Sequence, residues 1–333
     1  MTEIAPIVLT SGEPAGVAPE ISALAWQALR AKPECCFFLL GDAGYWARRN
    51  PDLVVRRIEE PGEASSVFDQ ALPVLHRPLA AHPAPGQIDP ATAPQVIAVI
   101  GDAVSLAFDG AVSAIVTNPI QKEALYASGF RHQGHTDYLG ALARQRGHDV
   151  HEVMMLVAKN LRTVPVTVHI PLSQVPGALT AEAIVAQARV VARALTHHFG
   201  IARPRLAFTG LNPHAGENGT IGTEDRDIIA PALRQLTSEG SVVLGPLPAD
   251  TAFHEEARTQ YDAILCMYHD QALIPIKTLD FHGGVNVSLG LPFIRTSPDH
   301  GTALNIAGRG SANPQSLIAA ISLAARMARA ARA

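Results

Sequence analysis

Short apolar runs alternate with stretches of helical periodicity along almost the whole chain. This alternation is typical of β–α units that build a mostly parallel sheet, so the predicted fold class is α/β. The expected strands are residues 7–10, 37–40, 114–117, 152–157, 164–169, 206–210, 242–245, 263–268 and 285–290. The expected helices begin near residues 18, 94, 121, 136, 180, 224 and 313.

The length of the chain predicts two lobes, each with its own core. The chain has 333 residues, of which 47% are hydrophobic and only 17% are charged. A single hydrophobic core rarely grows beyond about 250–300 residues. Residues 78–94 hold five prolines and little periodicity, so this segment is expected to be a surface loop.

Charge and terminal sequence argue against several classes of partner. The net charge is −4, and lysine and arginine are dispersed without a basic run, so neither nucleic acid nor a membrane is an expected partner. The first residues, MTEIAPIVLT, lack a basic segment followed by a long apolar one, and no window of about 18 apolar residues occurs. We therefore expect a cytoplasmic protein with a small-molecule partner. Cys35, Cys36 and Cys266 are expected to be buried thiols.

Three histidines lie at or just past the ends of expected strands. They are His169 in VTVHIPL, His214 in GLNPHAG and His269 in CMYHDQ. The carboxyl ends of strands are where α/β proteins bind ligands, and imidazole is a common ligand of zinc-like cations. A single histidine in such a place is more often a hydrogen-bonded residue that closes a loop, and spacing alone does not decide between the two roles.

A second group of polar residues suits an anion. A lysine is a point charge and an arginine a planar fork, and both bind phosphate or carboxylate. Thr136 could equally be an ordinary helix N-cap followed by Asp137, and the two basic side chains could be surface charges. The group consists of His135, Thr136, Lys277, Asn286 and Arg295.

Two loops have both a structural and a functional interpretation. Residues 10–21 follow a strand and open a helix, a place that favours anions, but G-x-G-x-x-G is absent and Gly12 and Gly16 fit a tight turn. In PLPADTAFH, Asp250 follows another expected strand. It could orient a ligand or cap the next helix, and capping is the commoner role.

Together these motifs closely resemble the 4-hydroxythreonine-4-phosphate dehydrogenase family of pyridoxal phosphate biosynthesis, over residues 7 to about 325. Two departures from the family pattern are Asp137, where many members have glutamate, and Val17–Glu20, where many read G-I-G-P-E. The motifs are SGEPAGVAPEI, GHTDYL, GLNPHAGENGTIGTED, GPLPADT, MYHDQALIPIK and GVNVSLGLPFIRTSPDHGTALNIAGRG.

The resemblance implies a two-lobed fold like those of isocitrate and isopropylmalate dehydrogenases, with mostly parallel sheets and an active-site cleft between the lobes. We place the first lobe at residues 1–131 plus 305–333. The second lobe, 132–304, would carry most metal and substrate residues. The family also implies a homodimer with its active site at the subunit interface.

The resemblance further implies a cofactor set and residue roles. NAD or NADP would bind near Gly216, Asn218 and Gly219, and a divalent zinc, magnesium or cobalt ion would bind the three strand-end histidines. The five residues of the polar group would contact the substrate, and Asp250 or Lys277 would take part in catalysis.

The implied reaction is NAD(P)-dependent oxidation of 4-phosphooxy-L-threonine, a phosphorylated hydroxy amino acid, at C3. Decarboxylation to 3-amino-2-oxopropyl phosphate would follow. Two alternatives remain. One is a related dehydrogenase of another phosphorylated or dicarboxylated vicinal alcohol, and the more distant one is a metal-dependent hydrolase.

Overall fold

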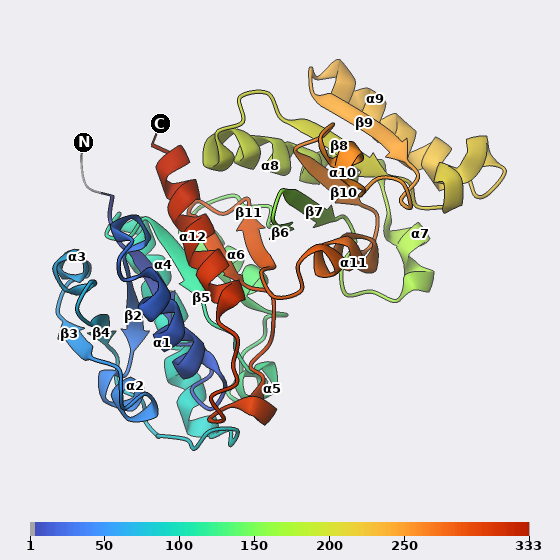
Figure 1. The fold of residues 1–333 in the computed structure, drawn as a ribbon. Coiled ribbons are helices and arrows are strands. Elements are labelled where there is room, and N and C mark those ends of the chain that lie inside the picture. The colour runs from blue at the N-terminus through green and yellow to red at the C-terminus, as the bar shows by residue number, and fades with distance from the viewer. Residues whose placement is uncertain (1–3, 333) are drawn as a thin grey trace. The chain divides into compact units, whose positions relative to one another are not determined.

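The computed structural model describes residues 4–332 (Figure 1). These residues form two compact units. Unit 1 comprises the described residues up to Val150 together with Leu291–Arg332, and unit 2 is His151–Gly290. Each unit contains strands of a mostly parallel sheet with helices packed on it, which confirms the α/β prediction.

The strands of unit 1 are all parallel, in the order β3-β4-β2-β1-β5-β12. Parallel strands buried on both faces read as continuous apolar runs, which is how β1 and β2 appear in the sequence. The strands are β1 (Ile7–Thr10), β2 (Phe37–Gly41), β3 (Val55–Ile58), β4 (Leu72–His76), β5 (Ala114–Thr117) and β12 (Arg295–Pro298).

One face of this sheet packs against α3 (Ala64–Val67) and α4 (Ala93–Phe108), whose apolar residues join those of β1, β2 and β5 in one core. The segment Pro90–Phe108 is long and apolar enough to cross a membrane by composition, but Val99, Ile100 and Val104 are core residues, so it is a core helix. The remaining helices of unit 1 are α1 (Ala18–Leu29), α2 (Ala43–Arg49), α5 (Lys122–Ala127), α6 (His135–Gln145) and α12 (Gln315–Ala330).

In unit 2 the strand order is β11-β6-β7-β10-β8-β9. The pairs β11·β6 and β6·β7 are antiparallel, and β7, β10, β8 and β9 run parallel. The strands are β6 (Val153–Ala158), β7 (Leu161–Pro165), β8 (Arg205–Thr209), β9 (Val242–Leu247), β10 (Ala263–Cys266) and β11 (Val285–Leu289). The helices are α7 (Val175–Ala178), α8 (Ala181–Phe199), α9 (Ala230–Ser238), α10 (Glu255–Arg258) and α11 (His269–Leu279).

The unit boundaries differ from the expected lobe boundaries at 131/132 and 304/305. Leu139 of α6 is completely buried in the core built on α4, so α6 belongs to unit 1. Strand β12 pairs with β5, which places Arg295 in unit 1 as well. Three of the five polar candidates, His135, Thr136 and Arg295, therefore lie in unit 1.

Most expected elements are present with the expected type, but several begin or end at other residues than expected. The strand expected at 164–169 ends at Pro165, and the one expected at 263–268 ends at Cys266. Strands β3, β4 and β12 were not expected, since their short runs lack a clear apolar alternation. Helix α11 was not expected either, because Pro275 interrupts its sequence pattern.

Candidate functional site

The carboxyl ends of β7, β10 and β8 lie side by side at one edge of the unit 2 sheet. Each of these strands leads into a segment with one of the three predicted histidines. His169 lies in the loop after β7, His269 is the first residue of α11 after β10, and His214 lies in the turn after β8. The parallel order of the strands therefore brings the three segments to the same edge.

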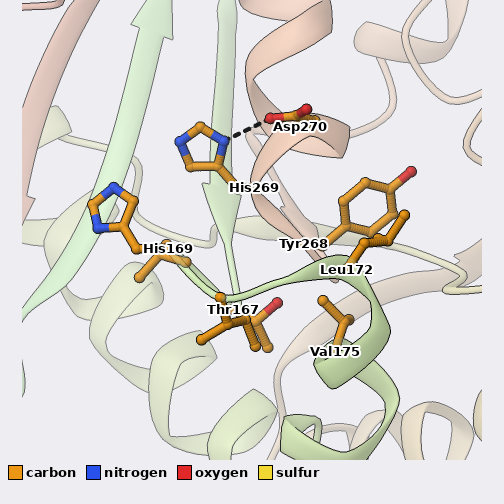
Figure 2. A pocket seen from close by; sticks show the side chains of 9 residues that line it. Thr167, His169, Leu172, Val175, Tyr268, His269 and Asp270 are labelled. Atoms are coloured by element: carbon orange, nitrogen blue, oxygen red, sulfur yellow. Dashed lines mark hydrogen bonds and ion pairs between the residues drawn. The ribbon is translucent and has the colours of Figure 1, made fainter.

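Two of the histidines meet in a pocket of about 240 Å³ (Figure 2). The ring centroids of His169 and His269 are 5.6 Å apart. Nδ1 of His269 lies 2.7 Å from Oδ1 of Asp270, a carboxylate that the sequence analysis did not select. A carboxylate bound to one ring nitrogen fixes the tautomer and leaves Nε2 to face a ligand. The lining residues are Thr167, Val168, His169, Ile170, Leu172, Val175, Tyr268, His269 and Asp270.

His214 lies in a turn of unusual backbone shape. The five successive residues from His214 to Asn218 have φ between 42° and 74°, in the left-handed region, and only Gly216 among them lacks a side chain. Each non-glycine residue in that region raises the conformational free energy of the backbone by about 1–2 kcal/mol. Within residues 4–332, no group of three or more His, Cys, Asp or Glu side chains is placed to hold a metal. Ligation by all three histidines thus stays a prediction.

Asp225 holds this turn, and the sequence pattern alone does not single it out. Its buried carboxylate accepts hydrogen bonds from the backbone N–H groups of Leu211 and Asn212, at 2.8 and 3.1 Å. A Cβ on Gly216 would lie 3.0 Å from Oδ2 of Asp225. The packing of the loop on Asp225 thus explains why a glycine occupies position 216. Cofactor contacts by Gly216, Asn218 and Gly219 stay a prediction.

The remaining predicted residues of unit 2 lie in separate elements. Asp250 is exposed in the turn after β9, and the N-cap of α10 is His254, so the capping role considered for Asp250 is wrong.

Nζ of Lys277 lies 5.3 Å from the ring centroid of Phe281. Oδ1 of Asn286, on β11, is buried and has no hydrogen-bond partner among the described residues. Such an oxygen is suited to a ligand.

Gln271 links the start of α11, where His269 lies, to the end of β8. Its Oε1 accepts from the backbone N–H of Met267 at 2.7 Å and from Oγ1 of Thr209 at 2.6 Å. Its Nε2 donates to the carbonyl of Gly210 at 2.8 Å. The side chain is only 8% exposed, so these bonds fix the start of α11 and the start of the loop to His214.

We expect Gln271→Ala to lower the free energy of unfolding by about 3 kcal/mol, because it leaves several buried polar groups without a partner. Urea unfolding measures this. Gln271→Glu keeps the acceptor for Met267 but loses the donor to Gly210, so it should have a smaller effect. A value for Gln271→Ala within about 0.5 kcal/mol of wild type, the range of an ordinary surface change, would contradict this role.

Unit 1 contains a pocket of about 200 Å³ at the carboxyl end of β5. Lys122 and His135 line it, and His135 is the first residue of α6, whose N–H groups favour an anion. Arg295 lies behind the wall: it is 3% exposed, and its Nη2 donates to Oγ1 of the lining residue Thr117 at 2.6 Å. The lining residues are Thr117–Ile120, Lys122, Gly134, His135, Ser297, Pro298, His300 and Gly301.

The electrostatics of this pocket keep His135 neutral. Burial, followed by the charges of Arg295 and Lys122, holds the pKa of His135 well below its ordinary value of 6.5. Its Nε2 is buried and has no hydrogen-bond partner within the described part of the chain. Burial also lowers the pKa of Arg295 to about 9, which leaves this side chain positive at neutral pH. The N-cap of α6 is Gly134 and not Thr136, which is the second helical residue.

The neutral state of His135 predicts a loss of stability in acid. Above pH 6.5 the imidazole is neutral in both folded and unfolded chains. As the pH falls through 6.5, only the unfolded chain takes up the proton, so the free energy of unfolding falls by at most about 1.4 kcal/mol per pH unit. Urea unfolding at pH 7.5 and 5.5 should show a smaller pH difference in His135→Asn than in wild type. The exposed His282→Asn is the control, and equal pH differences in both variants would contradict the assignment.

The fold alone defines a class. The described structure matches isocitrate dehydrogenase from Methylococcus capsulatus with a TM-score of 0.52 at 14% identity, over 99% of this chain and 88% of that one. The chain therefore has a mostly parallel α/β fold of the isocitrate dehydrogenase type, as the family resemblance implied.

Closer similarities identify the family. The family model for the pyridoxal phosphate biosynthetic protein PdxA matches residues 33–324. A protein named 4-hydroxythreonine-4-phosphate dehydrogenase from Bradyrhizobium diazoefficiens is 51% identical over 97% of each chain. The crystal structure of a dehydrogenase with that name from Klebsiella pneumoniae matches with a TM-score of 0.87 at 36% identity, over 98% of each chain. The chain belongs to the PdxA family, whose members are oxidoreductases of pyridoxine biosynthesis.

One further solved structure has a different named substrate. A terephthalate 1,2-cis-dihydrodiol dehydrogenase from Burkholderia xenovorans matches with a TM-score of 0.63 at 29% identity, over 97% of this chain and 98% of that one. The fold thus occurs in a protein named for a ring diol as well as in proteins named for a phosphorylated amino acid.

Proposed function

We propose that the chain is a cytoplasmic enzyme that oxidises 4-phosphooxy-L-threonine at C3, with NAD or NADP as acceptor and a divalent metal as cofactor. The observation that carries this proposal is the 51% identity, over 97% of each chain, to a protein named 4-hydroxythreonine-4-phosphate dehydrogenase. Oxidation gives a β-keto acid, which loses carbon dioxide and is reprotonated at C2 to give 3-amino-2-oxopropyl phosphate.

The unit 1 pocket is suited to the phosphate end of this substrate. Lys122 and the N-terminus of α6 supply positive potential, and Arg295 adds its buried charge from behind Thr117. Neutral His135 can donate one N–H to a phosphate oxygen. Contacts far from C3 hold the reacting carbon in place, and in this way remote binding energy lowers the barrier.

The histidine pocket of unit 2 is suited to the metal. His169 and His269 offer two imidazoles at one pocket, and Asp270 orients the second, so the donor set fits a zinc-like divalent ion. His214 would be the third ligand. When bound, the metal would polarise the C3 oxygen, and the dinucleotide would accept the hydride. The hydroxyl proton would go to Asp250 or to Lys277.

We also propose that the enzyme works as a homodimer. Exposed apolar side chains gather near the histidine pocket, since Val168, Ile170 and Leu172 line it and are 37%, 36% and 67% exposed. Ile274 and Phe281, on and just after α11, are 63% and 68% exposed. Exposed apolar side chains at a functional pocket are suited to a protein interface.

Mixing inactive variants tests the shared site. His269→Ala and Arg295→Met, each inactive alone, should regain part of the activity when they are refolded together, if these residues serve one site from opposite chains. Proven heterodimers without activity would place both residues on the same chain. A fully active monomer at assay dilution would remove the shared site altogether.

NADH absorbance across a small substrate panel tests the reaction. 4-Phosphooxy-L-threonine should give the highest kcat/KM. A ring cis-diol dicarboxylate is the main competitor, because the 29% identical relative is named for such a compound. Turnover with the diol and none with the phosphorylated amino acid would overturn the proposed substrate, and the absence of NADH or NADPH formation with every member would favour a hydrolase.

A further inference from the structure

The unit 1 pocket contains a charge that none of the predicted substrate residues accounts for. Lys122 is the first residue of α5 and lines the pocket together with His135. A Cβ built on Gly134 would lie 3.7 Å from Cε and 3.9 Å from Nζ of Lys122, so the ammonium group extends over the turn that begins α6. Two independent elements, α5 and α6, thus direct polar groups into the same space.

The charges around this space are not balanced by carboxylates. Among the described residues that line the pocket, none is an aspartate or a glutamate. The positive charges of Lys122 and Arg295 both act, after burial, to lower the pKa of His135. The buried Nε2 of His135 has no hydrogen-bond partner among residues 4–332. A pocket that collects positive charge and an unused ring nitrogen is suited to a bound anion.

We propose that Lys122 binds the phosphoryl group of the substrate and selects a phosphate monoester dianion over a carboxylate. This inference rests on the proposed function. Lys122 and Arg295 provide two positive charges, and neutral His135 provides none. A phosphate monoester, whose second pKa is about 6, has a charge close to −2 at neutral pH, and a carboxylate has only −1. Lys122 supplies the second charge that a dianion needs.

Inorganic phosphate and acetate are the probes for this selection. By isothermal titration calorimetry at pH 7.5, phosphate should bind wild type. Lys122→Gln should lower the affinity for phosphate by roughly tenfold. Lys122→Arg keeps the charge and should retain most of the affinity. Acetate should bind weakly to wild type, and Lys122→Gln should lower its affinity by only about threefold, because a charge of −1 loses half the Coulomb energy that a charge of −2 loses. Lys32→Gln, an exposed lysine of the same unit outside the pocket, is the matched control and should bind phosphate like wild type.

The kinetic result should agree with the binding result. Lys122→Gln should lower kcat/KM for 4-phosphooxy-L-threonine about tenfold, with the KM for the dinucleotide little changed. Because Lys122 is exposed, the variant should fold normally, and its thermal unfolding checks this. Phosphate affinity within twofold of wild type in Lys122→Gln, or equal losses for phosphate and acetate, would overturn the inference.

The two proposals fail in different ways. If wild type binds phosphate through Lys122 but forms no NADH or NADPH from 4-phosphooxy-L-threonine, the proposed reaction is wrong and the anion site stands. If wild type turns over this substrate and Lys122→Gln leaves its kcat/KM unchanged, the proposed reaction stands and the role of Lys122 is wrong.

Discussion

Replacing His269 by alanine should remove bound metal and lower kcat/KM by at least ~100-fold, while the chain stays folded. The expected cause is the loss of a ring that Asp270 orients and that lies 5.6 Å from the ring of His169. His269 is partly exposed at the start of α11, so its side chain contributes little to the core. Metal content by atomic emission and turnover after chelation and metal add-back measure the two effects.

Two further variants make this result specific. Asp270→Asn should keep the ring and weaken metal binding by about 10–100-fold, since it removes only the carboxylate behind His269. His282→Ala changes an exposed histidine elsewhere in unit 2 and should behave like wild type. Full turnover of His269→Ala in verified metal-free protein would contradict the metal site.

Arg295→Lys should lower kcat/KM for the phosphorylated substrate by roughly 10–100-fold, with the KM for the dinucleotide within twofold of wild type. The variant keeps the positive charge but loses the planar guanidinium group. In wild type, Nη2 of this group donates a hydrogen bond to Oγ1 of Thr117 at 2.6 Å, and the arginine is only 3% exposed. Steady-state kinetics with each substrate varied in turn measure the two constants. Equal losses for substrate and dinucleotide would mean that Arg295 supports the fold or the cofactor site.

The α/β class could be predicted from the sequence because the apolar runs of a buried parallel sheet are strong local signals. Strands β1 and β5 lie at the expected residues. Strand β12 was missed because its burial depends on pairing with β5, far away in the chain, and not on its own pattern. Helix α11 was missed because Pro275 lies inside it, and proline usually interrupts a helix.

The candidate site could be predicted only in part, because several of its residues depend on contacts between segments that are distant in the chain. His169 and His269 were selected by their position after strands, and the parallel order of β7 and β10 brings them together. Asp270, Gln271 and Asp225 were missed because their roles depend on hydrogen bonds to neighbouring loops that no spacing reveals. Lys122 was missed because a single lysine at a helix start gives no sequence signal, and only the pocket shows its proximity to His135.

Both products of the proposed reaction can be measured in a single assay. Wild-type protein is loaded with a divalent metal and given 4-phosphooxy-L-threonine and NAD or NADP, and the reduced dinucleotide and carbon dioxide are quantified in the same reaction. We expect equal amounts of the two products, and loss of both on chelation. Reduced dinucleotide without carbon dioxide, or product formation that chelation does not affect, would contradict it.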